Sequence, residues 1–312
     1  MLPFLLSPYY KKVIWGGSFL AKFKNAPSHL DHIGESWEVS AMPGHESVVA
    51  SGPMTGRTLF EVCRTRGAEL MGREVYERFD GRFPLLVKFI DAADRLSIQV
   101  HPGAANSLAP DAVNAKSEMW YILETMPQSK IILGFKNRIE PEVFSRHMAE
   151  GTTEQLLRVF DSCPGDVFFI PSGQVHGICA GNFLVEIQQA ADTTYRIHDY
   201  DRLGPNGCRR ELHHERAMES IDFENLAPEK THPTDALLHR SEFFRVDRCR
   251  MTDSDRVTIH NPSFTAVVCT DGFVELNTRG DVIRVPRGHT ALVPADTPSV
   301  LTGRGEALLI VP

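Results

Sequence analysis

Residues 165–177 read GDVFFIPSGQVHG, with Gly165, Pro171, Gly173 and His176 as fixed points. The run DVFFI is apolar and contains β-branched and aromatic residues, which favours a β-strand. The Pro and Gly residues that follow are typical of a tight turn. The stretch therefore predicts a strand, a turn and a second strand, with His176 just beyond the turn.

The C-terminus repeats this pattern. GHTALVPADTPSVLTGRGEALLIVP (288–312) aligns with GDVFFIPSGQVHGICAGNFLVEIQQ (165–189), and Ser299 falls where His176 stands. A shifted alignment places Ala291 at that position instead. Because an internal repeat is a strong signal of fold, we expect two related β-units, of which only the first has the His.

The fixed residues of the first copy match the second motif of the cupin family, G-x5-P-x-G-x2-H. The resemblance implies a mainly β protein of two jelly-roll barrels, with a few helices packed on the N-terminal barrel. It also implies that His176 points into the mouth of the first barrel as a metal ligand. The second barrel lacks that residue and is expected to hold no metal.

Short apolar runs between turn residues occur along the whole chain, which contains 23 Gly and 20 Pro. Such runs predict strands. We expect strands over 35–42, 83–92, 95–102, 118–124, 130–135, 166–171, 183–190, 243–251, 265–277, 289–294 and 307–312.

Two segments are expected to be helical. Residues 58–79 open with Thr58 and have Glu61 three residues later, the pattern of a capping box. Residues 141–160 begin with a Pro suited to a first helical turn, and Gly151 is expected to divide them into two short helices.

A polar stretch without periodicity, ENLAPEKTHPTD (224–235), follows the first copy of the repeat. Domain boundaries fall in such segments. We therefore predict a metal-binding N-terminal domain over 1–223, which includes both helical segments, and a C-terminal domain over 236–312.

Composition limits the classes of partner. The 312 residues carry a formal net charge of −7, which argues against binding to nucleic acid or to a membrane surface. No apolar run approaches the roughly 20 residues needed to cross a bilayer, and the N-terminus is a poor signal peptide. Six dispersed cysteines without a Cys-x-x-Cys pair favour free thiols. We expect a cytoplasmic protein.

The stretch SIQVHP (97–102) predicts a metal site. Because strand side chains alternate, Gln99 and His101 project from the same face. Glu118 begins another apolar strand, and His176 completes a set of nitrogen and oxygen ligands. Such a set suits one Zn²⁺ per chain with a position left for water or substrate, and other divalent ions accept the same ligands.

A narrower resemblance covers roughly residues 8–202. In order, the chain contains VIWGG, FPLLVKFIDA, LSIQVHP, KSEMWYIL, GDVFFIPSGQVHGI and LVEIQQAADTTYRIHDYDR. Together these segments resemble type I mannose-6-phosphate isomerases of the shorter bacterial branch. Where the longer branch carries RAGLTPK, this chain reads Arg196-Ile-His-Asp-Tyr-Asp-Arg202, and this departure affects the expected phosphate contacts. The resemblance implies interconversion of mannose 6-phosphate and fructose 6-phosphate through a cis-enediol.

By that resemblance Arg196 is the first candidate for catalysis, because a guanidinium stays charged and can lie along a developing oxyanion. Glu186 and Lys116 are candidates for proton carriers. Each also has a structural interpretation: Glu186 could only orient Arg196 through an ion pair, and Lys116 could be a charge at the rim. Lys88 and Arg202 are candidates for binding the substrate phosphate.

Two other functions remain open at this point. A non-catalytic protein of two cupin barrels could bind a sugar phosphate, and two His with one carboxylate could hold iron in a dioxygenase. Gln99 as an extra ligand and the predicted cations favour an anionic sugar as substrate. The sequence does not indicate an oligomeric state.

Overall fold

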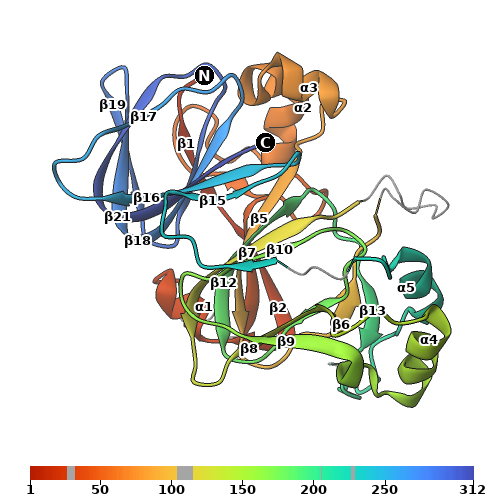
Figure 1. Cartoon of the computed structure of the whole chain (residues 1–312). Coiled ribbons are helices and arrows are strands. Elements are labelled where there is room, and N and C mark those ends of the chain that lie inside the picture. Colours follow the sequence, from red (N-terminus) through yellow and green to blue (C-terminus); the bar gives the residue numbers. More distant parts are fainter. Residues whose placement is uncertain (27–31, 104–114, 205, 226–228) are drawn as a thin grey trace.

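The computed structural model describes residues 1–26, 32–103, 115–204, 206–225 and 229–312. These residues form three antiparallel sheets, arranged as two β-rich halves one above the other (Figure 1). The prediction of a mainly β fold is confirmed. None of the described helices has the length and apolar character needed to cross a bilayer.

The N-terminal half contains two sheets whose facing sides share an apolar cluster that includes Trp120 and Ile178. The seven-stranded sheet has the order β14 (Glu229–Thr231), β10 (Val167–Ile170), β7 (Glu118–Thr125), β12 (Asn182–Gln189), β5 (Leu85–Ala92), β2 (Tyr9–Gly17) and β3 (Ile33–Val39). The five-stranded sheet has the order β13 (Tyr195–His198), β6 (Ile98–Val100), β11 (His176–Ile178), β8 (Lys130–Phe135) and β9 (Leu157–Asp161).

The C-terminal half is one nine-stranded sheet folded around its own apolar cluster. Its main order is β15 (Leu237–Arg240), β16 (Arg245–Met251), β21 (Ser299–Val311), β18 (Thr265–Thr278), β20 (Thr290–Val293), β1 (Phe4–Ser7) and β4 (Val48–Val49). In addition, β17 (Val257–Ile259) pairs with β21, and β19 (Asp281–Pro286) pairs with β18.

The repeat seen in the sequence reappears in the strands. In the first half β10 ends at Ile170 and β11 begins at His176, and in the second half β20 ends at Val293 and β21 begins at Ser299. Gly173, in the first turn, has a φ of +85° and donates its N–H to His101 O at 2.9 Å. A left-handed turn with this close contact favours Gly, and it ties the turn to the strand that leads to His101.

The helices are α1 (Phe19–Phe23), α2 (Leu59–Met71), α3 (Arg73–Arg78), α4 (Pro141–Glu150) and α5 (His214–Ser220), with a 3-10 turn η2 (Thr153–Leu156). The capping box of Thr58 and Glu61 opens α2, and Gly151 ends α4 in a left-handed conformation. Residues 157–161, of which we expected all but the last to be helical, instead form β9, because they pair with β8.

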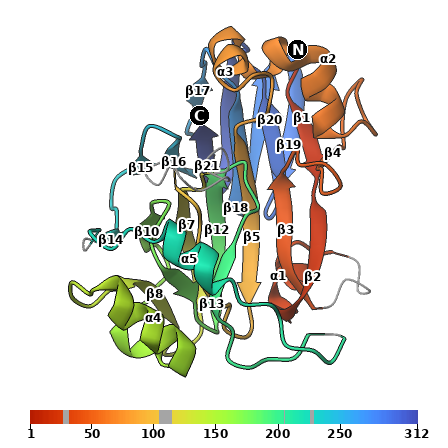
Figure 2. The same ribbon diagram turned by 90° about the vertical axis from the view of Figure 1, so that its right-hand side faces the viewer.

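The N-terminal strand belongs to the sheet of the C-terminal half, whereas the next strand, β2, belongs to the N-terminal half. β1 runs beside β20 in the C-terminal sheet (Figure 2), whereas β14, inside the expected linker 224–235, pairs with β10. A single apolar cluster that includes Phe4, Val87 and Phe264 joins the two halves. The chain therefore passes between the halves more than once, and the division at 224–235 stays a prediction.

Candidate metal centre and its pocket

One row of side chains crosses the five-stranded sheet. Arg196 on β13 lies opposite Gln99 on β6, and Gln99 lies opposite His176 on β11. Directly opposed residues of antiparallel strands project from the same face of a sheet. The three side chains therefore point together toward the interior of the barrel.

A second row crosses the seven-stranded sheet. Trp120, Glu186, Lys88 and Trp37 are successive cross-strand partners on β7, β12, β5 and β3. Lys88 Nζ donates to Glu186 Oε1 at 2.9 Å, and Trp120 Nε1 donates to Glu186 Oε2 at 3.1 Å. This buried row holds the Glu186 carboxylate in one orientation.

The expected ligands come together between these rows. Single ligand atoms of His101, Glu118 and His176 all lie within 4.8 Å of one another, and the three residues are at most 1% exposed. The carboxylate oxygens of Glu118 lie 3.3 Å from His101 Nε2 and 3.5 Å from His176 Nε2. Gln99 Nε2 lies 3.3 Å from His176 Nε2. The four side chains therefore meet at one point.

The hydrogen bonds of the two imidazoles fit a metal site. His101 Nδ1 lies 2.9 Å from Thr193 O, and His176 Nδ1 lies 2.8 Å from Gln174 O. Each Nδ1 therefore carries the proton and donates it, which leaves the Nε2 lone pair facing Glu118. Such contacts fix the ring that would bind a metal.

The protonation states fit as well. Burial lowers the pKa of both imidazoles, that of His176 to about 3. Burial would raise the pKa of Glu118, but the adjacent Lys116 ammonium is the strongest opposing influence, and that pKa lies well below its usual range. Lys116 Nζ lies 2.8 Å from Glu118 Oε2 and forms an ion pair with it. Neutral imidazoles and an ionised carboxylate are the ligand states that a divalent metal requires.

A pocket of about 340 Å³ opens beside this cluster. Of the residues we expected at the site, Lys88, Gln99, Lys116, Glu186 and Arg196 line it. Sequence reasoning missed four other charged residues of the lining, which are Lys11, Glu35, Asp192 and Arg210. Five cations and three carboxylates thus surround the cavity, an excess of positive charge that suits an anionic ligand.

Glu35 was detectable by a signal that the sequence does contain. It is a carboxylate in a strand that is otherwise buried, as Glu186 is. Its Oε2 accepts from Trp37 Nε1 at 2.7 Å and lies 3.7 Å from Lys88 Nζ. Burial opposes charge on Lys88, but Glu186 and Glu35 raise its pKa above the ordinary value. Lys88 therefore stays a cation between two carboxylates.

The structure shows where three of the expected residues, Arg202, Glu186 and Lys116, lie relative to the pocket. Arg202 does not line the pocket; its Nη2 donates to Asp199 Oδ1 at 2.6 Å. Glu186 pairs with Lys88, not with Arg196. Lys116 is 3% exposed and belongs to the buried cluster, so it is not a charge at the rim.

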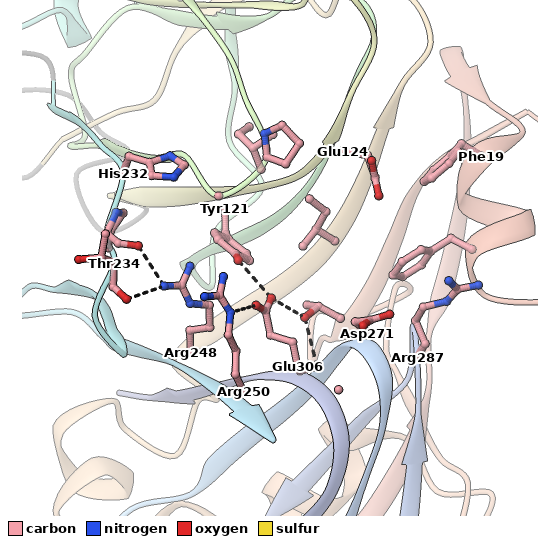
Figure 3. Close-up of a pocket in the computed structure, with 18 residues that line it drawn as sticks. Phe19, Tyr121, Glu124, His232, Thr234, Arg248, Arg250, Asp271, Arg287 and Glu306 are labelled. Carbon is pink, nitrogen blue, oxygen red and sulfur yellow. Dashed lines mark hydrogen bonds and ion pairs between the residues drawn. The ribbon is translucent and has the colours of Figure 1, made fainter. Parts of the chain in front are cut away.

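A second cavity, of about 620 Å³, lies between the two halves (Figure 3). Its lining has three arginines and three carboxylates, and the central one is Glu306. Glu306 accepts from Tyr121 Oη at 3.1 Å, from Arg250 Nε at 3.1 Å and from Thr270 Oγ1 at 3.0 Å. The charges of this cavity are balanced, unlike those of the pocket beside the His–Glu–His cluster.

Comparison with known proteins gives a consistent result. The family model for the catalytic domain of type I phosphomannose isomerase matches residues 4–128. The chain is 38% identical to the probable mannose-6-phosphate isomerase GmuF of Bacillus subtilis over 226 residues, 72% of this chain and 70% of GmuF. It is 32% identical to the putative mannose-6-phosphate isomerase YvyI of the same organism over 318 residues, 99% of this chain and 98% of YvyI.

Solved structures agree. The crystal structure of mannose 6-phosphate isomerase from Bacillus subtilis has a TM-score of 0.86 at 29% identity, with both chains covered completely. A zinc-bound mannose 6-phosphate isomerase shares the fold, with a TM-score of 0.80 at 17% identity over 100% of this chain and 99% of the other. With matching sequence over nearly its whole length and a matching fold, this chain belongs to the type I mannose-6-phosphate isomerase family of enzymes.

Proposed function

We propose that this enzyme interconverts mannose 6-phosphate and fructose 6-phosphate, with one zinc ion bound by Gln99, His101, Glu118 and His176. The observation that carries the proposal is the buried His–Glu–His cluster, with its ligand lone pairs converging, at a pocket with an excess of cations. Family membership supports the same substrate. A pocket of about 340 Å³ also lies within the usual range for small-molecule sites.

The cluster would hold the zinc ion through Nε2 of both imidazoles, the Glu118 carboxylate and the Gln99 amide. When bound, zinc supplies a Lewis acid that polarises a substrate carbonyl and stabilises charge on oxygen. The remaining chemistry is proton transfer. One proton moves between C2 and C1, and a second must move between the two oxygen atoms.

We assign the carbon-bound proton to Glu186. The donors Lys88 and Trp120 hold its carboxylate toward the interior, so its position is fixed before substrate enters. Lys88 itself is a cation that lines the pocket and can contact a substrate oxygen. The alternative in which Glu186 only orients Arg196 loses support, because no ion pair joins the two residues.

We assign the oxygen-bound proton to Lys116. Its Nζ lies 3.0 Å from His101 Nε2 and 2.8 Å from Glu118 Oε2, so a substrate oxygen close to the metal ligands is within its reach. Arg196 projects from the same sheet face as Gln99 and His176. Its permanent charge would stabilise the enediolate oxygens.

We also propose that the enzyme works in the cytoplasm. All six cysteines are free, two of them exposed, and exposed free thiols persist in a reducing compartment.

The test is isomerase activity in a coupled assay before chelation, after chelation and after addition of zinc. We expect one metal ion per chain, loss of activity on its removal and recovery with zinc. Full activity in protein shown by metal analysis to be metal-free would contradict the proposal. Oxygen consumption with iron, without isomerisation, would favour a dioxygenase.

A further inference from the structure

Arg210 lies on an irregular segment beside β13, the edge strand of the five-stranded sheet. The N–H of His213 donates to Arg196 O at 2.8 Å, and the N–H of Arg196 donates to His213 Nδ1 at 3.0 Å. Arg196 Nη1 donates to Glu211 O at 2.7 Å. The segment therefore runs along the free edge of β13. From the metal ligand His176 outward, the order is β11, β6, β13 and then this segment.

Asp199 fixes Arg210 in place. Arg210 Nε donates to Asp199 Oδ2 at 2.7 Å, and Arg210 Nη2 donates to Asp199 Oδ1. Asp199 is 5% exposed. Burial would raise its pKa, but the hydrogen bonds from Arg210 and Arg202 lower it, so the carboxylate is ionised. A bidentate contact of this kind holds a guanidinium in one plane.

The two arginines that share Asp199 differ in what they leave open. Arg202 uses Nη2 for Asp199 Oδ1, Nε for Asp199 O and Nη1 for Arg95 O. Arg210 Nη1 has no partner among the described residues, and Arg210 lines the pocket whereas Arg202 does not. Only Arg210 has a free guanidinium edge available to a ligand.

The neighbouring Arg196 makes this end of the pocket strongly cationic. Its Nε is buried without a hydrogen-bond partner. Burial and the charge of Arg210 lower the pKa of Arg196. Arg196 and Arg210 thus line the same end of the pocket and repel each other, although Asp199 and Glu211 partly offset their charges, and an anion bound there would stabilise both guanidiniums.

We propose that Arg210 binds the phosphate group of the substrate, the role for which the sequence made Arg202 a candidate. This inference rests on the proposed function, since it takes a sugar with its phosphate at the end of the carbon chain opposite C1 and C2. The reacting carbons then lie at Gln99 and His176, the phosphate lies beyond β13, and Arg196 lies between them.

Steady-state kinetics of Arg210→Gln test the proposal. Losing a charge-assisted contact to phosphate should raise the KM for mannose 6-phosphate about 10- to 100-fold, whereas kcat should change less than about 3-fold because the metal end is intact. Calorimetric titration of the zinc-loaded enzyme with inorganic phosphate should show the same loss of affinity. This readout does not depend on turnover.

Matched controls come from the same loop. Arg202→Gln removes the other partner of Asp199, and Arg209→Gln removes an exposed arginine paired with Asp201; both should leave KM and phosphate affinity within about 2-fold. If Arg210→Gln does not fold, Arg210→Lys, which keeps the charge but loses the bidentate geometry, should weaken phosphate binding by a smaller factor.

Unchanged phosphate affinity in both Arg210 variants, or an equal loss in Arg202→Gln, would overturn the inference. So would a wild-type enzyme that does not bind phosphate. If the wild type lacks isomerase activity but Arg210→Gln abolishes phosphate binding, the anion site stands and the proposed function fails.

Discussion

The two halves of the molecule contain the same strand–turn–strand unit but place different side chains in their interiors. In the first, the unit places His176 beside Glu118, and both are completely buried. In the second, Ser299 stands at the equivalent position and shares a hydrogen bond with Thr278 at 2.6 Å. Ala291, the alternative equivalent, belongs to an apolar cluster with Val267 and Leu301.

The difference shows that the fold of the unit does not depend on the buried charges. The left-handed turn residue is Gly173 in the first copy and Asp296 in the second, with φ of +85° and +50°. The C-terminal half fills its interior with apolar side chains, which contribute stability. The N-terminal half accepts buried ionisable groups, which cost free energy unless they are paired or bound to a metal.

The largest effect on activity should come from replacing His176, the residue that Ser299 matches in the second copy of the unit. His176→Ala removes a metal ligand, so the protein should lose its metal and kcat/KM should fall at least about 10³-fold. Metal analysis and the coupled assay measure both quantities.

Ser299→Ala is the matched control for that experiment. It should keep full metal content and activity and lose only about 1–2 kcal/mol of stability, because its hydroxyl hydrogen-bonds to Thr278 Oγ1 and Thr297 O. A comparable loss of activity in Ser299→Ala would show that the second barrel takes part in the chemistry.

The contact between the halves offers a second test. Lys24 Nζ lies 2.6 Å from Glu38 Oε1 and also donates to Gly288 O of the C-terminal half. Thr290 Oγ1 of that half donates to Glu38 Oε2 at 3.2 Å, and Lys24, Glu38 and Thr290 are all buried. Lys24→Met leaves Glu38 buried without its cation and should reduce the free energy of unfolding by about 3–5 kcal/mol. Denaturant unfolding measures this loss.

An exposed ion pair serves as the reference for Lys24. Arg66 and Glu69 form such a pair on α2, and Arg66→Ala should cost about 1 kcal/mol or less. If Lys24→Met cost no more than Arg66→Ala, the polar contact between the halves would not be a source of stability.

A third test addresses the apolar interior of the second half. Leu301 is completely buried there, and Leu301→Ala should reduce stability by about 2–5 kcal/mol through the cavity it leaves. Because no pocket residue is touched, kcat and KM of the folded enzyme should stay unchanged. Altered kinetics well below the melting temperature would show that packing in the second half affects the metal pocket.

The smallest effect concerns His239 on β15, whose ring stacks on Phe169 of β10 with centroids 4.3 Å apart. Burial lowers its pKa to about 4, below the value near 6.5 in the unfolded chain. The unfolded state therefore takes up the proton first, so stability is complete above pH 6.5 and is lost as the pH falls toward 4.

The loss at His239 should be about 1–2 kcal/mol, reduced by partial exposure to solvent. His239→Phe should remove this part of the acid sensitivity, which thermal melts of both proteins at pH 7 and pH 4.5 would measure. An identical change in melting temperature for both would rule out His239 as its source.

Local pattern in the sequence was sufficient for the strands that carry Gln99 and Glu118, the turn before His176 and the set of possible ligands, but it missed β1 and β2 and predicted a helix for most of β9. Gln99 and His101 share a face because strand side chains alternate, and His176 follows a turn encoded by Pro171 and Gly173. Both features depend on a few neighbouring residues, so the sequence alone could determine them.

Tertiary structure decided which distant charges enter the pocket. Glu35 reaches Lys88 only because β3 pairs with β5, and Arg210 replaces Arg202 at the rim only because its segment folds back along β13. The placement of β1 in the C-terminal sheet is of the same kind. Pairing between distant segments depends on the packing of the whole chain. The pattern of apolar residues within one segment therefore cannot predict it.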